Sequence, residues 1–157
     1  MRKRRHKPFY TKKLDQKKNA TMKMFLGEYT PNITEGSRIA LPKKLRDQIS
    51  GGQVVLSKGF EKCVLAYDKE DWAEKAQKQV LNNEDNVKTG DLERYLYTSA
   101  SETGIDSQGR LVLPADLLKY AGITKRLAII GVGDHIEIWD LESWRKHLEK
   151  ISARLTA

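Results

Sequence analysis

The chain has 157 residues, of which 39% are hydrophobic and 32% are charged. This length suits one domain or two small ones, and no apolar run reaches the roughly 18 residues of a spanning helix, which excludes a membrane protein. The composition also excludes a fully disordered chain, while the net charge of +8 makes a polyanionic partner the first function class to test.

The excess positive charge is confined to the N-terminal segment. Residues 1–23 contain ten lysines and arginines and one acid, whereas residues 24–157 carry 19 basic and 20 acidic side chains. Such a block predicts a disordered arm, which is either simply solvated or an aid to nucleic-acid binding. The arm has no apolar signal-peptide region, and the single cysteine, Cys63, excludes an internal disulfide, so we expect a cytoplasmic protein.

The remainder of the chain contains an internal repeat. A shift of 72 residues aligns 33–72 with 105–144 without a gap and gives nine identities in 40 positions. The pattern predicts two copies of one unit. The expected organisation is an arm (1–23), a first repeat (24–81), a linker (82–91) and a second repeat (92–157).

Each copy begins with a glycine-containing turn and a short strand. The turns are 34–37 and 106–109, and the strands that follow are 38–41 and 110–113. Pro42 and Pro114 come next, where a proline suits the first residue of a short helix, and Gly122 is expected to end the second of these helices.

A hairpin and a longer helix complete each copy. The β-rich runs predict hairpins of 54–57 with 63–67 and of 127–130 with 135–139. Asp68 and Asp140 are predicted as N-caps of the closing helices, and a short helix at 91–96 leads into the second copy. Apolar stripes at helical spacing are expected to pack against the core or another helix. They comprise Trp72, Ala76 and Val80, and Trp144, Leu148, Ile151 and Leu155.

Units this small cannot cover their own sheet edges, so the two copies are expected to pair into one body. The predicted fold class is α+β, mostly β with helices, built from two tandem β-α-β-β-α units in a pseudo-dimeric, barrel-like arrangement.

The segment from Asp106 to Pro114 resembles the signature of the swapped-hairpin AbrB-type DNA-binding domains. Four further segments resemble the MraZ family, and with them the resemblance covers nearly all of 24–155. They are Met24–Tyr29, Arg38–Pro42, Tyr120–Ile123 and Gly131–Asp140. The resemblance implies a bacterial transcriptional regulator, usually a repressor, that binds short direct repeats in double-stranded DNA upstream of the division and cell-wall gene cluster. It also implies a ring-shaped homo-oligomer associated with the nucleoid.

The family motif is an acid, three residues and an arginine, once in each copy. Copy two keeps it as Asp106 and Arg110, whereas copy one has Thr34 and Arg38. We expect Asp106 to fix its turn by accepting backbone N–H groups, and Thr34 to do so more weakly through its hydroxyl. A guanidinium at the exit of a turn can reach a phosphate or the edge of a guanine.

The candidate DNA-binding residues are Arg38, Arg110, Gly36, Ser37, Lys43, Lys44 and Arg46, and the turn-fixing residues are Thr34, Asp106 and Gly109. Because the basic helix residues follow the strand of copy one, the hypothesis is that copy one and the arm face DNA while copy two contributes more to assembly. The alternative is that both arginines only bridge to carboxylates of their own barrel.

Two other function classes compete with the regulator. No nucleophile, base and orienting carboxylate share a motif, and no phosphate-binding glycine loop is present, so an enzyme is not expected. We also expect no cofactor, no metal, no membrane and no small-molecule substrate. The remaining alternative is a binding module: an antitoxin-like AbrB-type protein, or an oligomeric scaffold whose basic arm binds nucleic acid or membrane phosphates non-specifically.

Overall fold

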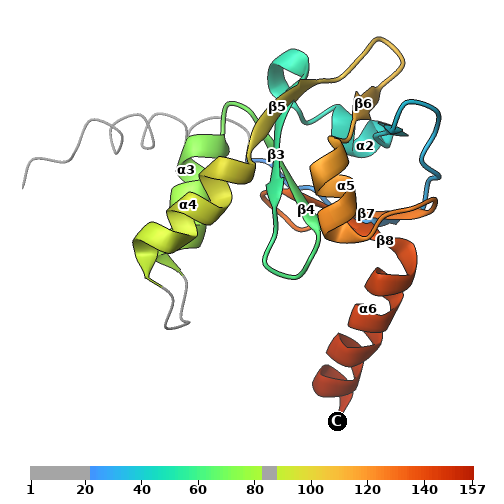
Figure 1. Cartoon of the computed structure of the whole chain (residues 1–157). Helices are drawn as coiled ribbons and strands as arrows, with labels where there is room; N and C mark the ends of the chain where they lie inside the picture. Colours follow the sequence, from blue (N-terminus) through green and yellow to red (C-terminus); the bar gives the residue numbers. More distant parts are fainter. Residues whose placement is uncertain (1–21, 83–87) are drawn as a thin grey trace, which may run out of the picture.

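The computed structural model describes residues 22–82 and 88–157 (Figure 1). Most of the expected disordered arm, and residues 83–87 of the expected linker, lie outside these ranges. The strands are β1 (Glu28–Tyr29), β2 (Arg38–Ala40), β3 (Gln53–Lys58), β4 (Val64–Asp68), β5 (Ser101–Gly104), β6 (Arg110–Val112), β7 (Leu127–Gly131) and β8 (Ile136–Asp140). The helices are α2 (Lys43–Arg46), α3 (Trp72–Leu81), α4 (Thr89–Ser99), α5 (Ala115–Ala121) and α6 (Leu141–Thr156), with a 3-10 turn, η1, at Ser50–Gly52.

The strands form two antiparallel sheets, which confirms the α+β class. The larger sheet has the order β1-β7-β8-β4-β3-β5, and β2 and β6 form a separate two-stranded ribbon. The outer strands β1 and β5 do not pair with each other in the described part of the chain, so the large sheet is open and not a closed barrel. None of the helices in that part is long and apolar enough to cross a bilayer.

The two copies are joined by strand pairs that are symmetric in the repeat. Ile39 pairs with its equivalent Leu111 at the centre of the β2–β6 ribbon, and Leu65 pairs with its equivalent Glu137 at the centre of the β4–β8 contact. In both places a strand of one copy pairs antiparallel with the same strand of the other. This arrangement confirms that the two copies pair as a pseudo-dimer.

The large sheet has an apolar core on each face. Along β4, Val64 and Ala66 belong to one core, and Leu65 and Tyr67 belong to the other. The first core lies beneath the β2–β6 ribbon and helices α2 and α5, and the second is covered by α3, α4 and the start of α6. Because both faces are covered, all five residues of β4 are buried.

The hairpin registers revise the gapless alignment of the two copies. Val54 pairs with Asp68 in the first hairpin, whereas Leu127 pairs with Asp140 in the second. Since Asp68 and Asp140 are equivalent, Leu127 takes the place of Val54 and lies one residue away from its aligned position. The second copy therefore has one extra residue before β7 and one fewer in the hairpin turn.

Some sequence predictions hold and others need correction. Gly122 ends α5 in the left-handed conformation as predicted, and Asp140 accepts a hydrogen bond from Ser143 N as an N-cap. Pro42 and Pro114 are the residues before their helices and not the first helical residues. The helix predicted at 91–96 extends over Thr89–Ser99, and the polar strand β5 was not predicted.

The two apolar helix stripes have different environments. Ala76 and Val80 are buried and Trp72 packs against the second core, as predicted. Of the predicted α6 stripe, Trp144 packs against that core, where Leu141 at the start of α6 is buried, whereas Leu148 and Leu155 remain 38% and 80% exposed. Within this chain the outer half of the second stripe is therefore not a core face, because α6 extends away from the body (Figure 1).

Asp68 does not act as the predicted N-cap but joins the end of β4 to the N-terminal segment. Its fully buried carboxylate lies 2.7 Å from Lys23 Nζ and accepts hydrogen bonds from the backbone N–H groups of Ser50 and Glu70. Burial alone would raise the pKa of Asp68, but these bonds outweigh it and lower the pKa. The base of the arm is therefore fixed to the folded body.

A second buried charge cluster surrounds His135. Its Nδ1 lies 2.7 Å from Asp134 Oδ1 and its Nε2 lies 3.0 Å from Glu137 Oε2, while its ring stacks on Tyr67. Burial opposes the charged imidazolium, but the two carboxylates outweigh burial and raise the pKa of His135 to about 9. His135 is therefore positively charged at neutral pH.

We predict that this cluster makes stability depend on pH. The raised pKa means that His135 stabilises the fold fully below about pH 6.5 and loses this effect as the pH rises through about 9. Chemical unfolding of the wild type and of His135→Gln should show a difference in unfolding free energy that shrinks by about 3 kcal/mol over this range. A difference that stays constant between pH 6 and 10 would contradict the assignment.

Candidate nucleic-acid interface

The outward face of the β2–β6 ribbon carries both motif arginines. Ile39 and Leu111 are buried in the first core, and strand alternation turns their neighbours to the other side. That outer face consists of Arg38, Ala40, Arg110 and Val112. Arg38 is paired with Val112 and Arg110 with Ala40, so each arginine lies opposite a small or medium apolar side chain.

In the turn of copy two, Asp106 organises the backbone and holds Arg110. Asp106 Oδ1 accepts hydrogen bonds from the N–H groups of Gln108 and Arg110, both at 2.9 Å, and Oδ2 lies 3.1 Å from Arg110 Nε. These bonds, first that from the Arg110 N–H, lower the pKa of Asp106. Among the described residues, Asp106 engages only Nε of the Arg110 guanidinium, which leaves the terminal nitrogens available for a ligand.

The turn of copy one holds its arginine differently. The Thr34 hydroxyl donates to the carbonyl of Arg38 at 3.1 Å, whereas the sequence had suggested that it would accept an N–H group. Arg38 Nη1 donates to the Glu35 carbonyl at 3.2 Å. Within residues 22–82 and 88–157, no carboxylate lies within ion-pair distance of Arg38, in contrast to Arg110.

The two turns need residues that tolerate positive φ. Gly36 and Gly109 both have φ of 77°, a backbone conformation that residues with a Cβ rarely adopt. Ser37 also has a positive φ, of 57°, which is unfavourable for a residue with a Cβ. The turn of copy one is therefore the more strained of the two.

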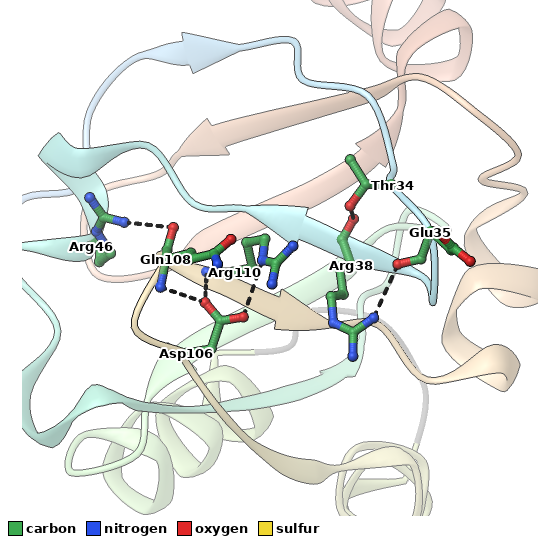
Figure 2. A network of polar contacts seen from close by, with 7 residues as sticks. All are labelled: Thr34, Glu35, Arg38, Arg46, Asp106, Gln108 and Arg110. Atoms are coloured by element: carbon green, nitrogen blue, oxygen red, sulfur yellow. Dashed lines mark hydrogen bonds and ion pairs between the residues drawn. The ribbon is translucent and has the colours of Figure 1, made fainter.

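The basic helix of copy one lies beside the turn of copy two. Because β2 and β6 are antiparallel, the end of β2 meets the other turn, and Leu41 N donates to the carbonyl of Gly109. Arg46 Nη1 donates to the Gln108 carbonyl, and a Cβ on Gly109 would collide with the Arg46 guanidinium. Figure 2 shows Arg46, Gln108, Asp106 and Arg110 at one end of the ribbon and Thr34, Glu35 and Arg38 at the other.

This arrangement changes the electrostatic expectation. The sequence suggested that Lys43, Lys44 and Arg46 add charge near Arg38, whereas the structure brings Arg46 to the turn that contains Arg110. Lys43 and Lys44 open the same helix, α2, and Lys43 forms an exposed ion pair with Asp47. Applying the repeat symmetry to an antiparallel strand pair could have indicated this exchange.

No group of three or more histidine, cysteine or acidic side chains in 22–82 and 88–157 is arranged to hold a metal ion. What the ribbon presents is two guanidinium groups over a small apolar surface, an arrangement suited to recognising an anion or a nucleic-acid groove.

We predict unequal roles for the two turn-fixing side chains. Asp106→Ala removes the acceptor of two N–H groups, so hydrogen exchange at Gln108 and Arg110 should accelerate by at least about tenfold. Thr34→Ala is the matched control, because the backbone bonds between Thr34 and Arg38 remain and exchange in its turn should change little. Unchanged exchange at Gln108 and Arg110 in Asp106→Ala would show that Asp106 does not order its turn, and equal acceleration in both variants would contradict the unequal roles.

Comparison with known proteins agrees with the two-copy architecture. The family model of the MraZ protein, whose description also calls it antitoxin-like, matches residues 24–94 and again 96–157. A protein of Corynebacterium glutamicum strain R is 38% identical over 134 residues, which cover 85% of this chain and 93% of that protein. A Clostridium tetani protein is 38% identical over 127 residues, covering 79% and 87%.

A third relative, from Limosilactobacillus fermentum, is 36% identical over 124 residues, covering 79% of this chain and 86% of that protein. All three are named transcriptional regulators and not enzymes, in agreement with the expectation that this chain is not an enzyme. The family model covers both copies, and these relatives are matched over most of their length. The chain therefore belongs to the MraZ family.

Proposed function

We propose that the protein is a sequence-specific DNA-binding transcription regulator, and that the outer face of the β2–β6 ribbon reads the DNA. The observation that carries the proposal is that both motif arginines lie on this one face, one of them without a carboxylate partner among the described residues. The names of the relatives support regulation of transcription. Such a protein would act in the cytoplasm, at the nucleoid.

The dimensions of the ribbon support contact with the major groove, which admits a two-stranded β-ribbon. Arg38 and Arg110 are diagonal neighbours in the register, which places the two residues about 7–8 Å apart. That separation corresponds to about two base-pair steps of 3.4 Å. The small side chains of Ala40 and Val112 allow close approach and can contact thymine methyl groups.

Both copies contribute to this face, so the initial hypothesis of a DNA-facing copy one and an assembling copy two needs revision. Copy one supplies Arg38 at one end of the ribbon and the Arg46 guanidinium at the other. Copy two supplies Arg110, whose orientation Asp106 sets. We still propose Arg38 as the stronger contact, because it does not have to leave a carboxylate to bind DNA.

The finer part of the proposal rests on the family resemblance. We propose a repressor that acts as a ring-shaped homo-oligomer on short direct repeats upstream of the division and cell-wall gene cluster. Several subunits on successive repeats would add their modest contacts through a high effective concentration. The exposed stripe of α6, with Leu148 and Leu155, is available for contacts between subunits.

We predict that loss of Arg38 weakens specific binding more than loss of Arg110. A good arginine–guanine contact contributes about 1–3 kcal/mol, so Arg38→Ala should lower affinity for operator DNA by about 5- to 160-fold per contact. Fluorescence anisotropy would measure both variants, with Arg145→Ala on α6 as the matched control. A larger loss from Arg110→Ala would overturn the assignment of Arg38 as the stronger contact.

The base of the basic arm is fixed near α2, which supports a helper role for the arm. Lys23 Nζ donates to the carbonyl of Gln48 at 2.6 Å, and Gln48 exchanges side-chain hydrogen bonds with the backbone of Met24. Gln48 follows α2 closely and also donates to the carbonyl of Lys44. The arm would therefore add phosphate contacts from the side of the ribbon where α2 lies.

We predict that removing residues 1–21 lowers affinity for operator and non-operator DNA by a similar factor, because phosphate contacts carry little sequence information. This deletion keeps Lys23 and its bond to Asp68. Binding across a salt series should also show a shallower dependence, by about 0.9 in logarithmic slope for each phosphate that the arm neutralises in the full chain. Specific binding that disappears with the arm would instead support the scaffold that binds nucleic acid non-specifically.

A further inference from the structure

A basic cleft lies at the end of α5 that is remote from the ribbon. It has a volume of about 490 Å³ and is lined by the tip of the β3–β4 hairpin, the C-terminal end of α5, Trp139 and α6. Helix α5 starts directly after β6 and spans about 10 Å, so the cleft is separate from the outer face of the ribbon (Figure 1).

Four lysines from three elements converge on this cleft. They are Lys62, Lys119, Lys146 and Lys150, and the one acidic side chain in the lining is Glu61. Within the part of the chain that the structure describes, none of the four ammonium groups lies within 4 Å of a carboxylate, although lysines elsewhere do, such as Lys69 with Glu102. Mutual repulsion of these ammonium groups would be relieved by a bound polyanion.

The other lining groups limit what can bind. The indole N–H of Trp139 donates to Glu137 Oε1, and the His147 ring lies 4.9 Å from the Trp139 ring, so both rings are held in place. The carbonyls of Leu118 and Lys119 at the end of α5 are used by the N–H groups of Ile123 and Gly122. The cleft therefore offers flexible cationic groups over an ordered aromatic floor.

We propose that this cleft binds a small phosphorylated anion with at least two phosphate groups. Its volume is within the range of small-molecule sites, about 300–1,000 Å³. Lysine binds phosphate as a mobile point charge, and four of them match an anion with several charges better than a single orthophosphate. A DNA backbone is less suited, because its phosphates are spread along a convex surface and this site is concave. The anion would be a ligand and not a substrate.

The test is titration of the full chain with inorganic pyrophosphate, followed by NMR at the indole N–H of Trp139, which responds to the cleft and not to the arm. Lys146→Gln/Lys150→Gln should weaken pyrophosphate binding by at least about tenfold, since half of the cationic groups are removed. The matched control is Lys78→Gln/Lys88→Gln, which removes the same charge from exposed lysines outside the cleft and should change affinity less than twofold.

Three results would overturn the proposal. The first is no shift of the Trp139 signal at millimolar pyrophosphate. The second is equal binding of pyrophosphate and sulfate, which would mean unselective attraction of anions. The third is a double variant that keeps pyrophosphate binding but loses DNA affinity or changes oligomer mass, which would assign the lysines to DNA or to a second copy.

Discussion

The rest of the structure depends on the pairing between the two copies. Neither copy has a sheet of its own that could bury both faces, because β4 needs β8 beside it and β2 needs β6. In the β2–β6 pair, Ile39 and Leu111 face inward and close the first core, which contains apolar residues of both copies. The same alternation turns Arg38 and Arg110 outward, so the packing that stabilises the fold also creates the surface that we assign to DNA.

Apolar runs and turn chemistry made much of this fold predictable. The strands β3, β4, β7 and β8 are short apolar runs between turn residues. Gly122 ends α5 because glycine readily adopts the left-handed conformation that closes a helix. Strand β5 was missed because Ser101–Gly104 is polar, and it becomes a strand through its partner β3. The shift of β7 by one residue was hidden because changes in two loops compensate in a gapless alignment.

The candidate site was predictable in its residues but not in their partners. The repeat identified both arginines and the acid that orients one of them. Helix α2 of copy one lies beside the turn of copy two, and Lys23 contacts Asp68. Both contacts join residues that are far apart in sequence. Asp68 and Asp140 are equivalent in sequence, yet only Asp140 caps a helix, because Lys23 and two backbone N–H groups occupy the Asp68 carboxylate.

The exchange of neighbours explains how two divergent copies can form one balanced surface. Arg110 is partly neutralised by Asp106, and the guanidinium that restores positive charge beside it comes from Arg46 of the other copy. At the opposite end of the ribbon, Leu113 N donates to the carbonyl of Ser37. Helix α5, which has Asp116 in its first turn, therefore begins beside the turn of copy one, where Arg38 has no carboxylate partner in the described chain. In the described chain, each end of the ribbon thus carries a copy-one guanidinium that forms no ion pair: Arg46 beside the turn of copy two, and Arg38 at its own turn.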